Sequence, residues 1–148
     1  MGVIFVTGDD TKDLLIPFIK DRKENISVEL INALYISASL GEIKSSQFWN
    51  YLGLESDYIN LDKQYLDEKL VLDPHVRSVL EELHKKYNLA LLSNDVSEWS
   101  SYLREKYNLN QYFNVIIISG DVRHRKPSEK IYRIALGKIN SSPDNCIF

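Results

Sequence analysis

Several features that define particular protein classes are scarce in this sequence. The only cysteine, Cys146, excludes an internal disulfide and fits a reducing compartment. No apolar run approaches the roughly 20 residues that cross a bilayer, and the N-terminus lacks the basic segment of a signal peptide. The formal net charge is −3, and no dense Lys/Arg block marks a nucleic-acid surface. We therefore predict a cytoplasmic protein that contacts neither membrane nor nucleic acid.

The composition is that of a folded globular domain. Hydrophobic residues make up 44% and charged residues 26% of the 148 positions. The three histidines, His75, His84 and His124, are scattered without the spacing of a metal site. A chain of this length accommodates one domain, or a small core with an inserted subdomain.

Four short apolar runs predict the strands of a sheet. Such continuous runs are typical of strands buried on both faces of a parallel sheet, and helical patterns separate them. The runs are Val3–Val6, Leu89–Leu92, Val115–Ile118 and Cys146–Phe148. This alternation predicts an α/β fold, and we expect the side chain of Cys146 to be buried in the last strand.

The segment from Thr11 to Val71 is predicted to be helical and is too long for one crossover. It therefore indicates an inserted helical cap (residues 11–71) on a core formed by residues 1–10 and 72–148. Ser27, Ser45 and Ser128 are the expected helix caps. Asp73-Pro74 has the pattern of a helix start, with Asp as the N-cap and Pro at the first helical position.

Small polar residues follow the predicted strands. They are Thr7-Gly8-Asp9-Asp10, Ser93-Asn94-Asp95 and Ser119-Gly120-Asp121, with Lys126 a few positions after the third. In an open parallel sheet, ligands bind at the carboxyl ends of the strands. A hydroxyl, backbone amides and a lysine are groups that bind phosphate oxygens, so these segments predict a phosphate site.

Two of these segments resemble motifs of the haloacid dehalogenase (HAD) superfamily. Leu91-Leu92-Ser93-Asn94-Asp95 resembles its motif II, and the stretch from Arg125 to Tyr132 resembles its motif III. Leu72–Val76 is similar to the return from a helical cap into the core. The resemblance covers nearly the whole chain and implies a Rossmann-like parallel sheet core with an inserted α-helical cap.

The resemblance also implies a chemistry. In the family, a motif I aspartate attacks the substrate, while a Ser or Thr and a Lys hold the transferred group. Carried onto this chain, it assigns phosphate binding to Ser93, Asn94 and Lys126. It further implies Mg²⁺ as cofactor and a small phosphorylated metabolite as substrate.

Motif I departs from the family pattern. The direct register places Val6 at the nucleophile and Gly8 at the second carboxylate, and neither can do that chemistry. A displaced register makes Asp9 or Asp10 the nucleophile, so these two are the candidate catalytic residues. Motif IV, which supplies metal ligands, is expected directly after Phe148, so no metal ligand is assigned.

Each candidate also has a purely structural interpretation. Asp9 and Asp10 could cap the following helix, and Ser93 could be a turn residue. Asp95 is interpreted as a helix N-cap, and Lys126 could be a solvated charge.

Three functions stay open at this point. The leading hypothesis is a phosphatase-type hydrolase, and its rivals are an inactive ligand- or protein-binding module and a dehalogenase. A carboxylate near both Ser93 and Lys126 would favour the hydrolase. Apolar surface beside the last predicted strand suggests that the chain could also form a homo-oligomer.

Overall fold

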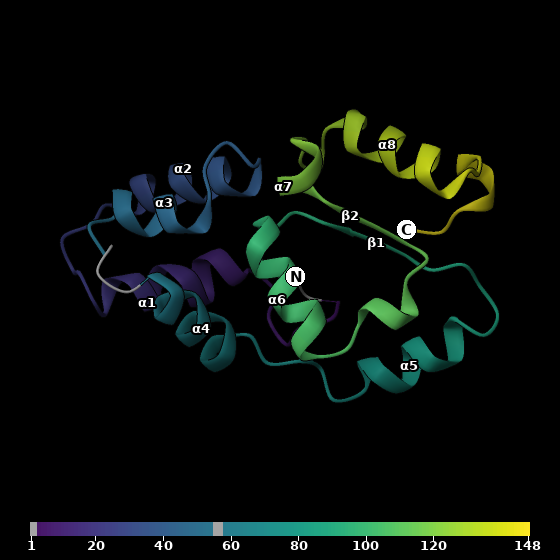
Figure 1. The fold of residues 1–148 in the computed structure, drawn as a ribbon, viewed down its shortest axis with the longest axis horizontal. Coiled ribbons are helices and arrows are strands. Elements are labelled where there is room, and N and C mark those ends of the chain that lie inside the picture. Colours follow the sequence, from purple (N-terminus) through teal and green to yellow (C-terminus); the bar gives the residue numbers. More distant parts are fainter. Residues whose placement is uncertain (1–2, 55–57) are drawn as a thin grey trace.

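The computed structural model describes residues 3–54 and 58–148. Helices α1–α4 gather at one end of the molecule, and the two strands lie at the other end with α5 and α8 (Figure 1). The elements are a π-helical turn η1 (Thr11–Leu15), α1 (Ile16–Lys20), α2 (Val28–Ser39), α3 (Ser45–Tyr51), α4 (Tyr58–Lys69), α5 (Val76–Leu83), β1 (Ala90–Ser93), α6 (Ser97–Lys106), η3 (Asn110–Tyr112), β2 (Val115–Ile118), α7 (Ser119–Val122), α8 (Glu129–Ile139) and η4 (Pro143–Asn145). No helix in the described ranges is long and apolar enough to cross a membrane.

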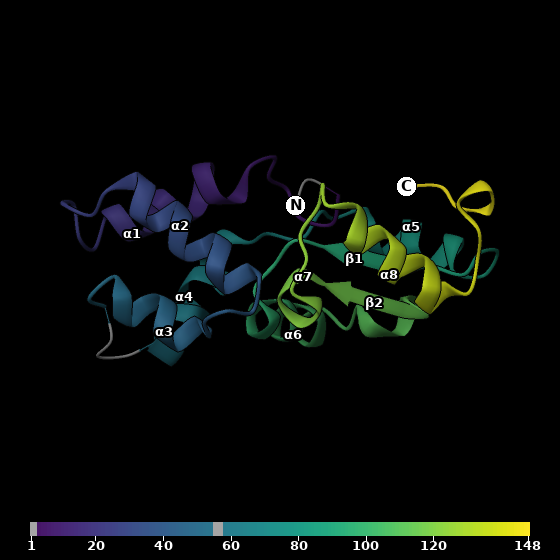
Figure 2. The same cartoon turned by 90° about the horizontal axis from the view of Figure 1, so that it is seen from above.

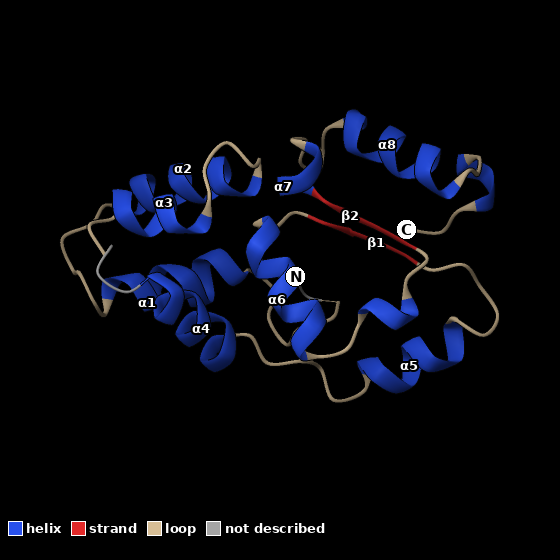
Figure 3. Cartoon of the chain, in the orientation of Figure 1, coloured by secondary structure: helices blue, strands red, loops and turns tan. Residues whose placement is uncertain are grey.

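Strands β1 and β2 pair in parallel and form a two-stranded sheet (Figure 3). The register runs from Ala90 opposite Val115 to Ser93 opposite Ile118. Both strands were predicted from their apolar runs, with β1 displaced by one residue and β2 at its predicted bounds. The parallel arrangement and the mixed α/β fold class are confirmed.

Two other predicted strands are wrong. Val3–Val6 does not join the sheet: Phe5 forms one isolated antiparallel bridge with Leu72, while Val3 and Val6 are 83% and 62% exposed. Phe5 instead packs its ring edge-on against Tyr107, with centroids 5.9 Å apart. An apolar run supplies strand propensity, but a strand also needs a partner edge, and tertiary contacts to the core hold Phe5 elsewhere.

The end of the described chain departs from the prediction in the same way. Cys146–Phe148 follows η4 as irregular chain, and Cys146 is exposed rather than buried. Pro143 starts η4, and the aromatic ring of Phe148 packs edge-on against Tyr132 of α8, with centroids 5.7 Å apart. The short apolar triplet is therefore held by one aromatic contact and not by a strand ladder.

Helices cover the sheet on both sides (Figure 2). On one face, Ile117 of β2 packs with Ile131 and Ala135 of α8. A separate cluster joins Val76 and Leu80 of α5 to Leu109 and Tyr112. Helix α8 thus covers the face of the sheet that carries Ile117, because its inward residues recur at helical spacing.

The largest apolar core lies among the helices of residues 11–70 and α6. Its most deeply buried members include Phe18, Phe48, Trp49, Tyr65 and Trp99. The Trp99 ring of α6 stacks on Tyr35 of α2 at 6.3 Å and meets Phe48 edge-on at 5.5 Å. Helix α6 is therefore packed directly into the helical end of the molecule.

The expected caps have mixed outcomes. Ser27 caps α2 as predicted, since its hydroxyl accepts a hydrogen bond from the backbone N–H of Leu30 at 3.1 Å. Ser128 occupies the N-cap position of α8 without a side-chain hydrogen bond. The Ser45 prediction is wrong: Lys44 holds the N-cap of α3, and Ser45 is buried and donates to Asp62 at 2.8 Å.

A close backbone junction joins α2 to the carboxyl ends of both strands. The Ser119 hydroxyl, at the start of α7, donates to the Ser39 carbonyl and accepts from the Asp95 N–H at 2.9 Å. Gly41, with φ of +66°, brings its Cα so near the Gly120 carbonyl that a Cβ would collide with it. The segment after α2 is thereby fixed against the strand ends where the candidate site residues lie.

Candidate functional site

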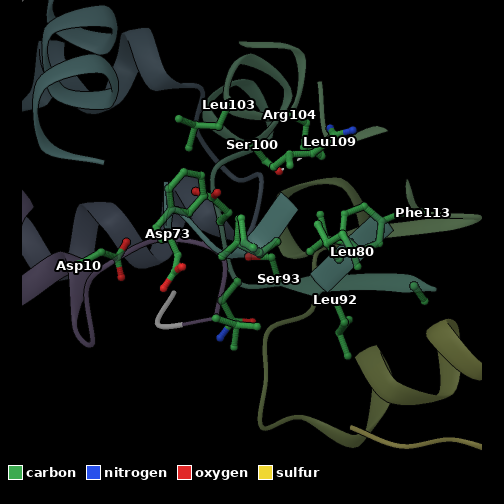
Figure 4. A pocket seen from close by; sticks show the side chains of 18 of the residues that line it. Asp10, Asp73, Leu80, Leu92, Ser93, Ser100, Leu103, Arg104, Leu109 and Phe113 are labelled. Atoms are coloured by element: carbon green, nitrogen blue, oxygen red, sulfur yellow. Dashed lines mark hydrogen bonds between the residues drawn. The ribbon is translucent and has the colours of Figure 1, made fainter. Parts of the chain in front are cut away.

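A cavity of about 830 Å³ runs beside β1. All four β1 residues line it and no β2 residue does, so the edge of β1 that does not pair with β2 faces the cavity. Leu80 and Phe113 lie at one end and Asp10 at the other, with Ser93 between them (Figure 4). The cavity is therefore apolar at one end and polar at the end where β1 stops.

Asn94 and Lys126 hold each other at the polar end. The Asn94 amide donates to the Lys126 carbonyl at 3.0 Å, and its Oδ1 accepts from the Lys126 N–H at 2.7 Å. This reciprocal pair uses both hydrogen-bonding groups of the amide and fixes the loop after α7 to the end of β1. The two motifs recognised in the sequence are thus physically joined.

The Lys126 side chain contacts the end of β1. Its Nζ donates to the Leu92 carbonyl at 3.1 Å and lies 5.2 Å from the centroid of the Phe148 ring. Burial lowers the pKa of Lys126, because the charged ammonium loses solvation there. The ammonium is thus held at the carboxyl end of β1, beside Ser93.

The two candidate aspartates have different surroundings. Asp9 is exposed, and its Oδ1 accepts a hydrogen bond from the backbone N–H of Lys12 at 3.0 Å, as expected of a capping residue. Asp10 precedes η1 without a side-chain capping bond, and burial raises its pKa. Of the two, Asp10 is the carboxylate that stays available at the polar end of the cavity (Figure 4).

Asp95 is the most perturbed carboxyl group of the site. Burial, and then the charge of Asp10, raises its pKa to about 7. Its Oδ1 accepts from the Val96 N–H at 2.8 Å, and Val96 rather than Asp95 occupies the N-cap of α6. The interpretation of Asp95 as a helix N-cap is therefore wrong, since it is a buried group in the cavity wall.

Arg125 is a cavity residue for which the sequence assigned no role. Its guanidinium carbon lies 5.5 Å from the centroid of the Tyr35 ring, and its Nη1 is buried without a hydrogen-bond partner among the described residues. It lines the main cavity and also a second one, of about 620 Å³, together with Lys12 and Tyr35. The sequence feature that could have indicated a role for Arg125 is its position directly before Lys126, a predicted phosphate-binding residue.

The cavity collects every site residue that the sequence proposed. Asp9, Asp10, Ser93, Asn94 and Lys126 all contribute to its wall. The residues of the direct register behave differently: Val6 is exposed outside the cavity, and Gly8 has open space around it. Asp73 and Arg104 also line the cavity. The prediction of Asp73 as a helix N-cap is wrong, because His75 occupies the N-cap of α5, and the sequence gave no signal for Arg104.

The described residues do not form a complete metal site. Among residues 3–54 and 58–148, no group of three or more His, Cys, Asp or Glu side chains could hold a metal ion. At the polar end, the charge of Asp10 raises the pKa of Asp95, and the charge of Asp9 raises that of Asp10. Mg²⁺ requires near-octahedral oxygen coordination, so these residues do not fit the ion by themselves.

Comparison with known proteins places this geometry in a family. The model of the haloacid dehalogenase-like hydrolase family matches residues 9–148. The chain is 29% identical over 83 residues to the phosphoglycolate phosphatase of Salmonella typhimurium (strain LT2), which covers 55% of this chain and 33% of that protein. It is 25% identical over 80 residues to the N-acylneuraminate-9-phosphatase of Homo sapiens, covering 54% of this chain and 32% of that protein. It thus spans about a third of the length of these relatives.

Solved structures show the same fold. A HAD family enzyme from Bacteroides thetaiotaomicron superposes with a TM-score of 0.79 at 16% identity, over 97% of this chain and 76% of that one. The Asp-to-Ala mutant of that enzyme, solved with magnesium and inorganic phosphate, superposes with a TM-score of 0.77 at 18% identity, over 96% of this chain and 76% of that one. Because the family model matches residues 9–148, this chain belongs to the haloacid dehalogenase-like hydrolase family.

Proposed function

We propose that this chain is a phosphatase-type hydrolase whose cavity binds the phosphoryl group of a small phosphorylated metabolite. One observation carries the proposal: the end of β1, the Asn94–Lys126 pair and Asp10 meet at the polar end of one cavity. A phosphoryl group there would find the Ser93 hydroxyl and the Lys126 ammonium, which suit its oxygens. The phosphatase activities of the relatives support the same substrate class.

The proposal divides the chain into two parts. Residues 1–10 and 72–148 would form the core that holds the phosphoryl group, and residues 11–71 the helical cap that closes over the substrate. Tyr35 of α2 lines the cavity and supports this division, since it brings the predicted cap to the binding site. The apolar cavity end would then receive the part of the metabolite that carries no charge.

Asp10 is the proposed nucleophile. Its Oδ would attack phosphorus, the ester P–O bond would break, and water would then hydrolyse the aspartyl phosphate to release inorganic phosphate. The alcohol leaving group needs a proton, and Lys12, not a carboxylic acid, stands two residues after Asp10. The family supports Mg²⁺ as the cofactor, so we include the ion in the proposal. The described residues alone supply too few ligands to hold it.

The missing general acid and metal ligands determine the turnover that we expect. Nucleophile, acid and metal ligands act as a unit in such enzymes, so an incomplete set costs several orders of magnitude in turnover. We expect p-nitrophenyl phosphate to be hydrolysed slowly with Mg²⁺, near background, by a residual turnover that requires Asp10, while inorganic phosphate binds the cavity. Calorimetric titration of phosphate and a phosphate-release assay, each with and without EDTA, measure the two quantities.

The variants Asp10→Asn and Asp9→Asn decide between the two aspartates. If turnover is present and Asp10→Asn alone abolishes it, Asp10 is the nucleophile. If neither variant matters and phosphate still binds, the chain is an inactive phosphate-binding module. That alternative is favoured by one observation: Lys12, which cannot act as a carboxylic acid, stands two residues after Asp10. If inorganic phosphate does not bind, both the hydrolase and the inactive phosphate-binding module are ruled out.

A further inference from the structure

Two cations stand next to each other in the sequence but point to different places. Lys126 Nζ contacts the Leu92 carbonyl at 3.1 Å, at the end of β1. Arg125 extends to Tyr35 of α2, with its guanidinium carbon 5.5 Å from the ring centroid. A single phosphoryl group held at the end of β1 therefore does not account for Arg125.

Arg125 is held in place but retains an unused donor. Its backbone is fixed on both sides, because the Arg125 carbonyl accepts from the Ser128 N–H at 2.8 Å and Lys126 is paired with Asn94. The side chain is partly covered and stacks on an aromatic ring, and its Nη1 has no partner among the described residues. An unpaired buried donor costs free energy, so a ligand that satisfies it gains affinity.

The surroundings of Arg125 also fit an anion. Arg125 stands between the main cavity and the second one, whose wall includes Lys12. Arg104, the other arginine of the main cavity, is already committed to Ser100 at 3.3 Å and Asn110 at 2.8 Å. The planar guanidinium fork matches two oxygens of one carboxylate or phosphoryl group.

We propose that Arg125 binds a second anionic oxygen group of the substrate, which makes the preferred ligand a phosphate monoester with a second oxyanion. This inference rests on the proposed function, because it assumes that the primary phosphoryl group occupies the end of β1. Arg125 is thus a specificity residue, and Lys126 holds the phosphoryl group. The contact with the Tyr35 ring holds the guanidinium at the cavity wall.

Three phosphoryl compounds and inorganic phosphate test the proposal by calorimetric titration. Phosphoglycolate carries a carboxylate, methylenediphosphonate a second phosphoryl group, and 2-hydroxyethyl phosphate no second charge. In the unmodified chain, at least one of the first two should bind about tenfold more tightly than 2-hydroxyethyl phosphate. The compound that shows the gain identifies the second group as carboxylate or phosphoryl.

Arg125→Gln should remove that gain and leave the affinity for 2-hydroxyethyl phosphate and inorganic phosphate within about twofold. Arg125→Lys should restore part of it, because the charge returns without the fork. Arg123→Gln, at an exposed arginine in the same loop, is the matched control and should change nothing. Circular dichroism and a urea titration verify that each variant is folded.

The outcomes separate the two proposals. If phosphate binds but Arg125→Gln weakens all four ligands equally, or none, the inference is overturned and the proposed function stands. If none of the four ligands binds the unmodified chain, the proposed function fails and the inference fails with it.

Discussion

At the scale of single residues, the polar end of the cavity depends on buried groups whose charge is perturbed. Asp95 is buried near Asp10, and it accepts a hydrogen bond from the Val96 N–H. Burying a carboxylate favours its protonated form. The charge state of this residue therefore links the cavity to the stability of the strand end.

Asp95→Asn should make the protein more stable above pH 7. Because the pKa of Asp95 is about 7 in the folded chain and about 4 in an unfolded one, the folded state binds its proton more tightly. The stability that this proton contributes is present below pH 4 and is lost as pH rises toward 7 and beyond, by on the order of a few kcal/mol. Asn keeps an oxygen for the Val96 N–H and carries no charge.

Urea titrations at pH 5 and pH 8 measure this effect. The unmodified chain should lose more stability between the two pH values than Asp95→Asn does. Asp121→Asn, at an exposed carboxylate after β2, serves as the control. It should lose as much stability between pH 5 and pH 8 as the unmodified chain does. An equal loss of stability between pH 5 and pH 8 in Asp95→Asn and in the unmodified chain would contradict the expectation.

Asn94→Ala should loosen the loop that carries Lys126. The substitution removes both hydrogen bonds to the Lys126 backbone, which should cost about 1–3 kcal/mol of stability. Affinity for inorganic phosphate should fall as well, since Lys126 is no longer held at the end of β1. Urea titration and phosphate calorimetry measure both, with exposed Asn88→Ala as a control that should leave them unchanged.

At the scale of elements, one partly buried carboxylate joins α3, α4 and α6. Asp62 of α4 accepts hydrogen bonds from the Ser45 hydroxyl at 2.8 Å and from Trp49 Nε1 at 2.6 Å, both on α3. It also accepts from Trp99 Nε1 of α6. Asp62 satisfies three buried donors at once, so the helical end of the molecule is organised around a polar centre beside an aromatic core.

Asp62→Ala should destabilise the protein by on the order of 3 kcal/mol or more, because it leaves two buried indole N–H groups and one hydroxyl without an acceptor. Urea titration followed by tryptophan fluorescence measures the loss. Asp67→Ala is the matched control: Asp67 lies on the same helix and pairs with Lys106 of α6 at 2.6 Å near the surface. A pair so exposed contributes about 1 kcal/mol or less. Equal losses for the two variants would refute the role of Asp62.

The same elements show how far sequence reasoning extends. Val115–Ile118 and the start of α2 were predictable, because local propensity and a Ser27 cap agree with their tertiary environment. Val3–Val6 was not, because its β-propensity says nothing about whether a partner edge is available. The role of Asp62 could not be predicted, because its hydrogen-bond partners lie 13 to 37 residues away in the sequence.

The candidate site was predictable to a different degree. The motifs located Ser93, Asn94 and Lys126, because strand ends gather at one edge of a parallel sheet. Arg125 and Asp95 acquire their character from the surroundings, namely the Tyr35 ring and burial beside Asp10. Such features depend on side-chain environment, which residue spacing does not encode.

At the scale of the whole molecule, apolar surface remains uncovered around β1. The edge of β1 that faces the cavity pairs with no other described strand, and the apolar cavity end is formed by side chains such as Leu83 and Phe113. Val79 of α5 also lines this wall and is 49% exposed. An unpaired strand edge beside apolar surface promotes pairing with another chain.

We expect the chain to self-associate through this surface. Sedimentation velocity over a range of concentrations should show a rising average mass. Val79→Lys should reduce association without unfolding the protein, because it places a charge in the exposed part of the cavity wall while leaving the core intact. Leu30→Lys is the matched control, since Leu30 is 44% exposed on α2 and lies outside the cavity. It should associate like the unmodified chain. A monomer at every concentration, or equal effects of the two lysines, would show that the edge of β1 is not the surface of contact.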